Sequence, residues 1–271
     1  MSTRSVKIVL LTLPLIGAAY YFGVICGQMS GAYDLLLAPS RDGMILLLRM
    51  LLALGIVAVA AGTAAVLVRP TWATMLAFSL SGAALLLGWE VTQHSMVLTV
   101  LYVVAGIAYV VSAAKELGQR IKFSLSAVSE GQSLYLVALL VVVLGSFYTG
   151  CAERIKREGF SIPEEYVATF VDQAVKRVAP TAPEAARDAV QSEVRQQFRR
   201  MLDVMLQQLE PFEQFIPLFV TLGLFMSLFT SIRLLSWVPM LIMGAVFELL
   251  KAVGIARVTV ESVEVERLVL S

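Results

Sequence analysis

Seven stretches of the chain are almost wholly apolar, and each has about the length of a membrane-spanning helix. A helix needs about 20 mostly apolar residues to cross the hydrocarbon core of a bilayer. The stretches are 7–28, 44–68, 72–90, 96–114, 131–150, 213–232 and 235–251. The pattern predicts an all-α fold, a polytopic bundle of about seven transmembrane helices. Helices 1–5 would lie in residues 1–150 and helices 6–7 in residues 213–252.

The last two apolar stretches are interrupted only by the short sequence Ser231-Ile232-Arg233-Leu234. So short an interruption favours a tight hairpin of two antiparallel spans. The alternative is one span followed by a helix that lies in the membrane interface. The first stretch also has an alternative interpretation, as a signal peptide, because Arg4 and Lys7 precede its apolar run. That run continues to Cys26, which is long for a signal peptide, so we expect an uncleaved anchor.

Residues 151–212 form the only long polar stretch, and they carry two helix-start signals. Residues 161–164 read S-I-P-E and residues 181–184 read T-A-P-E. In each, a Ser or Thr cap precedes a Pro in the first turn and a Glu that can bond back to the cap. Apolar residues recur after each signal at steps of three and four, as on one face of a helix. The stretch therefore predicts an extramembrane hairpin of two amphipathic helices.

A lone hairpin buries little apolar surface, so its apolar stripes need contacts beyond those with each other. One interpretation is that the hairpin folds back on itself and on the membrane surface. The other is that part of the second stripe contacts a second copy or a protein partner. Met side chains adapt well to partner surfaces, so the candidate contact residues are Phe198, Met201 and Met205.

The C-terminal tail, residues 253–271, has a different pattern. From Arg257 to Leu270 β-branched residues alternate with polar ones, which is typical of a β-strand. Since no other segment has this pattern, the strand would need to form its own hairpin, stay disordered, or add to a sheet supplied by another chain. Self-association or a protein partner at the tail is therefore a second candidate contact.

Composition supports a membrane location. Hydrophobic residues make up 58% of the chain and charged residues 15%, well below the quarter that is usual for soluble domains. The charge is balanced, with 21 basic and 20 acidic residues, so no positive field indicates nucleic acid as a partner. The lipid bilayer is the expected environment, either a plasma membrane or a bacterial inner membrane.

Lys and Arg in short loops favour the cytoplasmic side of a membrane. With the N-terminus inside, seven spans place these residues on the inner face: Arg4, Lys7, Arg69, Lys115, Arg120, Lys122 and Arg233. The outer hairpins then offer only Arg41. The asymmetry predicts a cytoplasmic N-terminus, with the polar hairpin and the C-terminal tail on the outer side.

Ionisable residues inside spans are costly and suggest function. Arg49 lies inside the second stretch, Glu90 ends the third and Glu248 is near the end of the seventh, so all three would reach the outer boundary. Each could simply extend its charged group to the interface. Alternatively, Arg49 forms an intramembrane ion pair with Glu248 or Glu90. His94, the only histidine, has no convergent ligands, so we expect no metal.

The two cysteines, Cys26 and Cys151, would both lie at the outer surface. They could form a disulfide if their helices are neighbours in an oxidising compartment, or remain two separate thiols. Small residues at four-residue spacing, such as Ala19, Gly23 and Gly27, predict close packing of the first helix.

No catalytic motif is present. The patterns H-E-x-x-H, G-x-S-x-G and G-x-x-x-x-G-K-[ST] are absent, and no span carries a central acidic pair. We therefore expect no catalysis and no cofactor. The sequence favours a non-catalytic scaffold or subunit of a membrane assembly. The alternative is a transporter or channel for a neutral or apolar solute.

Overall fold

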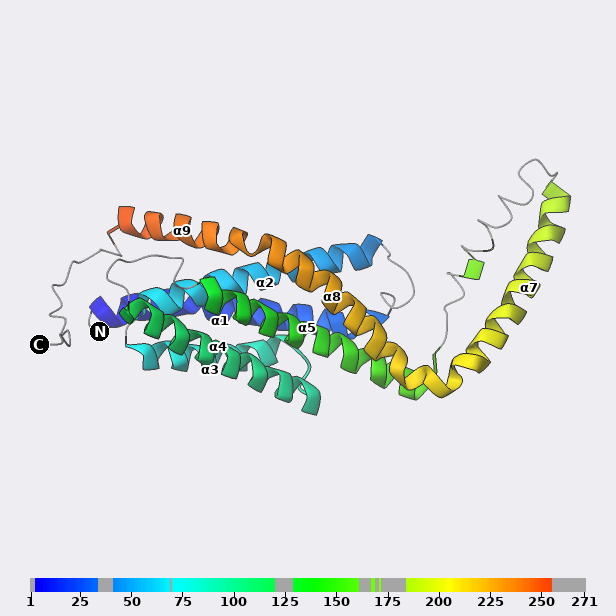
Figure 1. Cartoon of the computed structure of the whole chain (residues 1–271), viewed down its shortest axis with the longest axis horizontal. Coiled ribbons are helices and arrows are strands. Elements are labelled where there is room, and N and C mark those ends of the chain that lie inside the picture. The colour runs from blue at the N-terminus through cyan, green and yellow to red at the C-terminus, as the bar shows by residue number, and fades with distance from the viewer. Residues whose placement is uncertain are drawn as a thin grey trace, which may run out of the picture.

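The regular elements of the computed structural model are all helices (Figure 1). The structure describes residues 3–33, 41–68, 70–119, 129–160, 167–168, 171 and 184–254, and no strand occurs among them. In chain order the elements are α1 (Thr3–Ser30), α2 (Arg41–Leu67), α3 (Thr71–Gly88), α4 (Gln93–Gln119), α5 (Ser129–Glu158), α7 (Glu184–Leu209), the 3-10 helix η3 (Glu210–Phe215), α8 (Ile216–Leu235) and α9 (Trp237–Ala252). The predicted all-α fold is confirmed for this part of the chain.

Within the described ranges, six segments are long and apolar enough to cross a membrane, which indicates an integral membrane protein. They are Ile8–Ser30, Arg41–Leu67, Thr71–Gly88, Gln93–Gly118, Ser129–Glu158 and Pro211–Leu235. The first five correspond to the first five predicted spans. The helices α1 to α5 run alternately in opposite directions, with α1 in contact with α2, α3 and α5 (Figure 1).

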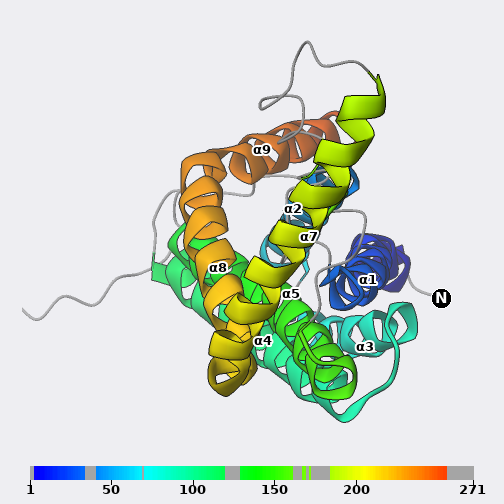
Figure 2. The same ribbon diagram turned by 90° about the vertical axis from the view of Figure 1, so that its right-hand side faces the viewer.

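The tight hairpin predicted for residues 213–251 is not what the structure contains. Helices α8 and α9 run on towards the same end of the molecule, with a bend between them (Figures 1 and 2). Ser236, the one residue between them, is itself helical at φ −59° and ψ −22°, so the chain does not reverse there. Pro239 follows in the first turn of α9. Because proline has no N–H to donate to the Leu235 carbonyl, it favours a kink and not a turn.

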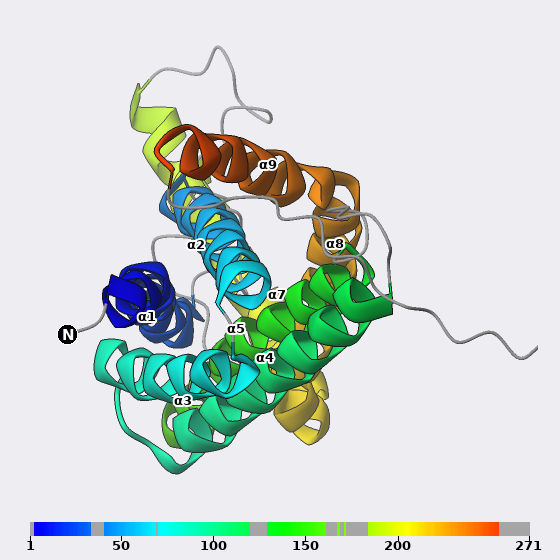
Figure 3. The ribbon, with the colours of Figure 1, turned by 90° about the vertical axis from the view of Figure 1, so that its left-hand side faces the viewer.

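This continuation changes where the chain ends. The C-terminal end of α9 lies at the same end of the bundle as the start of α1 (Figures 1 and 3), whereas seven spans would have put it at the opposite end. The position of Arg233 also differs from the prediction. The sequence placed it in an inner loop, but it lies within α8, just before the bend. The tail from residue 255 onward lies outside the described residues, so its strand stays a prediction.

The helix α7 projects beyond the end of the bundle where α5 ends (Figure 1). At about 1.5 Å per residue it is about 40 Å long, as the second stripe of the polar stretch predicts. Val167 and Val171 are buried against Val194, Phe198 and Leu202 of α7. Apart from residues 167, 168 and 171, the first helix of the predicted hairpin lies outside the described residues.

Candidate functional site

The three ionisable residues predicted at the outer boundary do not converge. Glu248 forms an ion pair with Lys251, one turn away on α9, with 2.7 Å between Oε1 and Nζ. Arg49 lies in the first half of α2 and Glu90 just after α3, both towards the other end of the bundle. Within the described ranges no ion pair joins Arg49 to either carboxylate. Because α9 continues the direction of α8, it carries Glu248 away from Arg49.

Of the two alternatives for the cysteines, the structure contains separate thiols and not the candidate disulfide. Cys26 and Cys151 are both free and buried. Their helices are neighbours, since Ser146 of α5 donates a hydrogen bond to the carbonyl oxygen of Cys26, with 3.0 Å between the oxygens. However, α1 and α5 run in the same direction (Figure 1), so Ser146 and not Cys151 is level with Cys26. Cys151 lies about 7.5 Å further along the axis of α5, a large offset for a disulfide.

The proposed contact residues share one side of α7 but differ in burial along it. Phe198 is half-buried against Val167 and Val171. Met201 and Met205 are 61% and 46% exposed, and Val204 between them is 55% exposed. The exposed stripe of α7, defined as Met201, Val204 and Met205, is therefore the part available to a partner.

A polar depression of about 940 Å³ lies where α4, α5 and η3 meet, at the end of the bundle from which α7 projects. His94 approaches Glu153 there, with 3.8 Å between Nε2 and Oε1, and Glu153 also lies 3.6 Å from Arg157. The backbone N–H of Phe160 donates to the carboxylate of Glu213. The His94 and Glu153 side chains are each about half exposed, so water screens this pair.

This depression has little catalytic or metal-binding potential. The described ranges hold no group of three or more His, Cys, Asp or Glu side chains placed to bind a metal. Its one imidazole contacts a carboxylate that is shared with an arginine, which is typical of a solvated surface network. The sequence did not predict the His94–Glu153 contact, because the two residues are far apart in the chain and neither lies in a motif.

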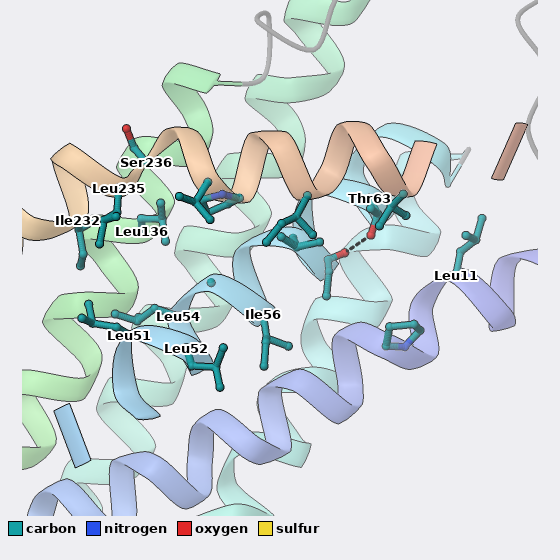
Figure 4. Close-up of a pocket in the computed structure, with 18 of the residues that line it drawn as sticks. Leu11, Leu51, Leu52, Leu54, Ile56, Thr63, Leu136, Ile232, Leu235 and Ser236 are labelled. Atoms are coloured by element: carbon teal, nitrogen blue, oxygen red, sulfur yellow. Dashed lines mark hydrogen bonds between the residues drawn. The ribbon is translucent and has the colours of Figure 1, made fainter. Parts of the chain in front are cut away.

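An apolar cavity of about 690 Å³ lies between α1, α2 and the α8–α9 bend (Figure 4). Leu11 and Pro14 of α1 form one side of this bend cavity, and Leu51, Leu52, Leu54 and Ile56 of α2 form its floor. Ile232, Leu235, Pro239, Ile242 and Val246 close it from α8 and α9. Its volume lies within the range of about 300–1,000 Å³ that is usual for small-molecule sites.

Two hydroxyl groups line the bend cavity, and both protons are already donated within their own helices. Thr63 donates to the Ala60 carbonyl at 2.9 Å, and Ser236 donates to the Arg233 carbonyl at 3.0 Å. No charged side chain lines the cavity. It can therefore hold an apolar molecule by burial alone, and it offers no nucleophile or acid–base pair.

The sequence contained one signal for this cavity that the hairpin interpretation missed. Pro239 kinks a helix that would otherwise pack closely along α2, and Gly55 and Ala60 present almost no side chain to the space opposite. Comparison with known proteins adds no homologous site. No protein-family model, curated protein or solved structure matches this chain.

Proposed function

We propose that this protein is a non-catalytic subunit or scaffold of a membrane assembly, and that it holds a partner through α7. The observation that carries the proposal is the exposed stripe of Met201, Val204 and Met205 on a helix that projects beyond the bundle (Figure 1). The bundle anchors the helix in the bilayer. The partner would then be recruited to one face of the membrane.

The stripe is an apolar part of a helix that also carries many charged residues. Arg195, Arg199, Arg200 and Asp203 surround it in the sequence. Scattered exposed apolar residues are normal, but a run at helical spacing on a projecting element marks an interaction surface. Burying a single Met side chain fully stabilises by roughly 1.5–3 kcal/mol, so covering this stripe would contribute several times the thermal energy.

The proposed orientation keeps the N-terminus in the cytoplasm. If α8 and α9 form one pass, six passes place the start of α1 and the end of α9 together on the cytoplasmic side, and α7 outside. Lys251, at the end of α9, then joins Arg4, Lys7 and Lys115 on the inner side, which adds to the basic residues there.

The test is the double substitution Met201→Asp with Met205→Asp. The matched control is Gln196→Asp with Gln207→Asp, which adds the same charge to the opposite side of α7. Native mass is measured after mild extraction and again in lipid nanodiscs. We expect the methionine variant to lose the partner and the glutamine variant to keep it. A wild-type protein that is monomeric in both media would refute the scaffold function.

The bend cavity favours a second candidate, a carrier of an apolar solute. Gly55 lines the cavity, and a Cβ there would meet no atom within 4 Å. We expect Gly55→Leu to fill the cavity and abolish retention of a fluorescent fatty acid by the purified protein. Gly17→Leu, which also meets no atom within 4 Å of its Cβ but lies outside the cavity, should leave retention unchanged. Equal retention in all three proteins would exclude this candidate.

A further inference from the structure

Arg233 lies near the middle of the membrane-spanning bundle. Along the α8–α9 pass it is equally far from Leu218, which lines the polar depression at one end, and from Glu248, which pairs with Lys251 at the other. The preceding residue, Ile232, lines the bend cavity together with Leu54, the central residue of α2 (Figure 4). The hydrocarbon core of a bilayer is about 30 Å thick, so a residue at its middle has about 15 Å of hydrocarbon between it and each surface. We expect this environment for Arg233.

The guanidinium group of Arg233 has no acidic partner in the described part of the chain. The side chain is exposed, and its charged group lies 5.9 Å from the centre of the Phe229 ring. A cation–π contact at that distance is weak compared with the cost of an arginine facing lipid at this depth. Arginines closer to a boundary can extend to the headgroups, but the middle of the bundle is the hardest position from which to do so.

The helix that carries Arg233 is the least buried of the six candidate spans. Only 17% of the apolar segment of α8 is buried, compared with 33–56% in the other five candidate spans. Exposed residues follow one another along α8 and into the start of α9 at steps of three and four, which makes one continuous stripe. This intramembrane stripe consists of Phe219, Leu222, Met226, Thr230, Arg233 and Trp237. Gly223 beside it meets no atom within 4 Å of its Cβ position, so a neighbouring helix can approach closely there.

We propose that the intramembrane stripe binds a transmembrane helix of a partner protein, and that this helix carries an Asp or Glu that pairs with Arg233. The proposal rests on the proposed function, since the partner would be a subunit of the same assembly. Charge complementarity selects the occupant, because an apolar helix alone would leave the guanidinium unpaired in hydrocarbon.

A second copy of this chain does not fit. In the spans that the structure describes, acidic residues occur only near the ends, such as Asp42, Glu90, Glu116, Glu130 and Glu248. A symmetric dimer through α8 would bring two Arg233 groups to the same depth and add repulsion. The carboxylate must therefore come from a different protein.

The experiment places a photo-crosslinking amino acid at Met226, which is 59% exposed, in cells that express the full chain. Val104 of α4, 58% exposed on another span, is the matched control position. We expect Met226 to crosslink to a transmembrane segment of another protein that contains Asp or Glu. The yield should fall about tenfold with Arg233→Leu and stay within about twofold with Arg233→Lys. Changing the partner's carboxylate to its amide should reproduce the loss.

Four results would overturn the inference. They are crosslinks to lipid alone, crosslinks to a second copy, a partner segment without an acidic residue, and a yield that Arg233→Leu does not change. Thermal unfolding of the Arg233→Leu variant tests for misfolding. The substitution removes an unfavourable charge, so the midpoint of thermal unfolding should be unchanged or higher than in the wild type. An assembly lost in the Met201/Met205 variant but kept in Arg233→Leu would refute only this inference. A monomeric wild type would refute the proposed function itself.

Discussion

Gly23 of α1 lies directly against the backbone of Leu85 in α3, so closely that a Cβ on Gly23 would overlap the Leu85 carbonyl oxygen. Gly88 of α3 meets the carbonyl oxygen of Tyr20 in the same way. The two helices therefore touch backbone to backbone. Such an approach between membrane helices requires small residues, since dispersion and weak polar contacts hold them together.

Replacing Gly23 by alanine should destabilise the bundle. The added methyl group meets backbone atoms, which cannot rotate away, and overpacking of this kind typically costs about 1–3 kcal/mol. We expect a lower midpoint of thermal unfolding in detergent. Gly17→Ala is the control on the same helix, because its Cβ meets no atom within 4 Å. Alanine is the better helix former, so the control should be neutral or slightly stabilised. Equal midpoints for the two variants would contradict the α1–α3 contact.

The loss of a hydroxyl group should affect stability differently at two buried tyrosines of α4. The Tyr102 hydroxyl lies 3.0 Å from Ser81 Oγ, which itself donates to the Phe78 carbonyl, so Tyr102 is the donor of the pair. The Tyr109 hydroxyl is buried and has no hydrogen-bond partner among the described residues. Its ring stacks on Tyr135 with 5.3 Å between centroids.

We therefore expect Tyr102→Phe to lower the free energy of unfolding by about 1 kcal/mol, because it removes a satisfied hydrogen bond. Tyr109→Phe should leave stability unchanged or raise it, since it keeps the stacked ring and removes an unpaired polar group. Chemical denaturation in matched detergent micelles measures both. A loss of stability in Tyr109→Phe as large as that in Tyr102→Phe would show that the Tyr109 hydroxyl has a partner.

The sequence predicted the helices well because their lengths and apolar content are set by the bilayer. Five spans and the polar helix with Met201 and Met205 follow from hydropathy and periodicity alone. The small-residue ridge through Gly23 is confirmed as well, since its spacing is a local property of α1. The direction of the chain after Leu235 is not local. It depends on whether a short interruption turns or stays helical, and hydropathy does not distinguish these outcomes.

The candidate sites were harder to predict for the same reason. Pairing Arg49 with Glu248 required the last helix to fold back, and the helical Ser236 sends it the other way. The bend cavity combines residues of α1, α2, α8 and α9, none of which is unusual on its own. The sequence predicted a loop position for Arg233, because basic residues commonly flank membrane spans. Only the continuation of α8 into α9 places it near the middle of the bundle.

Both cysteines should behave as protected free thiols. Cys26 and Cys151 are buried, and the parallel arrangement of α1 and α5 offsets them along the bundle. We expect N-ethylmaleimide to modify neither in the folded protein, and to modify both after denaturation without a reductant. Intact mass measures the number of adducts. Modification that appears only after reduction would show that the disulfide exists and that the helices can shift by more than a turn.

The position of the end of α9 decides between six and seven passes. Val253 follows α9 and is 65% exposed, while Gln196 is exposed on α7, at the other end of the molecule. Each is replaced by cysteine and probed with a membrane-impermeant maleimide in right-side-out vesicles, where the two buried native thiols contribute little background. With one continuous α8–α9 pass, Gln196→Cys should react at once and Val253→Cys only after permeabilisation. Reaction of both before permeabilisation would instead require α8 and α9 to cross separately. That result would also return Arg233 to a loop, because the turn between two crossings must lie at a membrane surface.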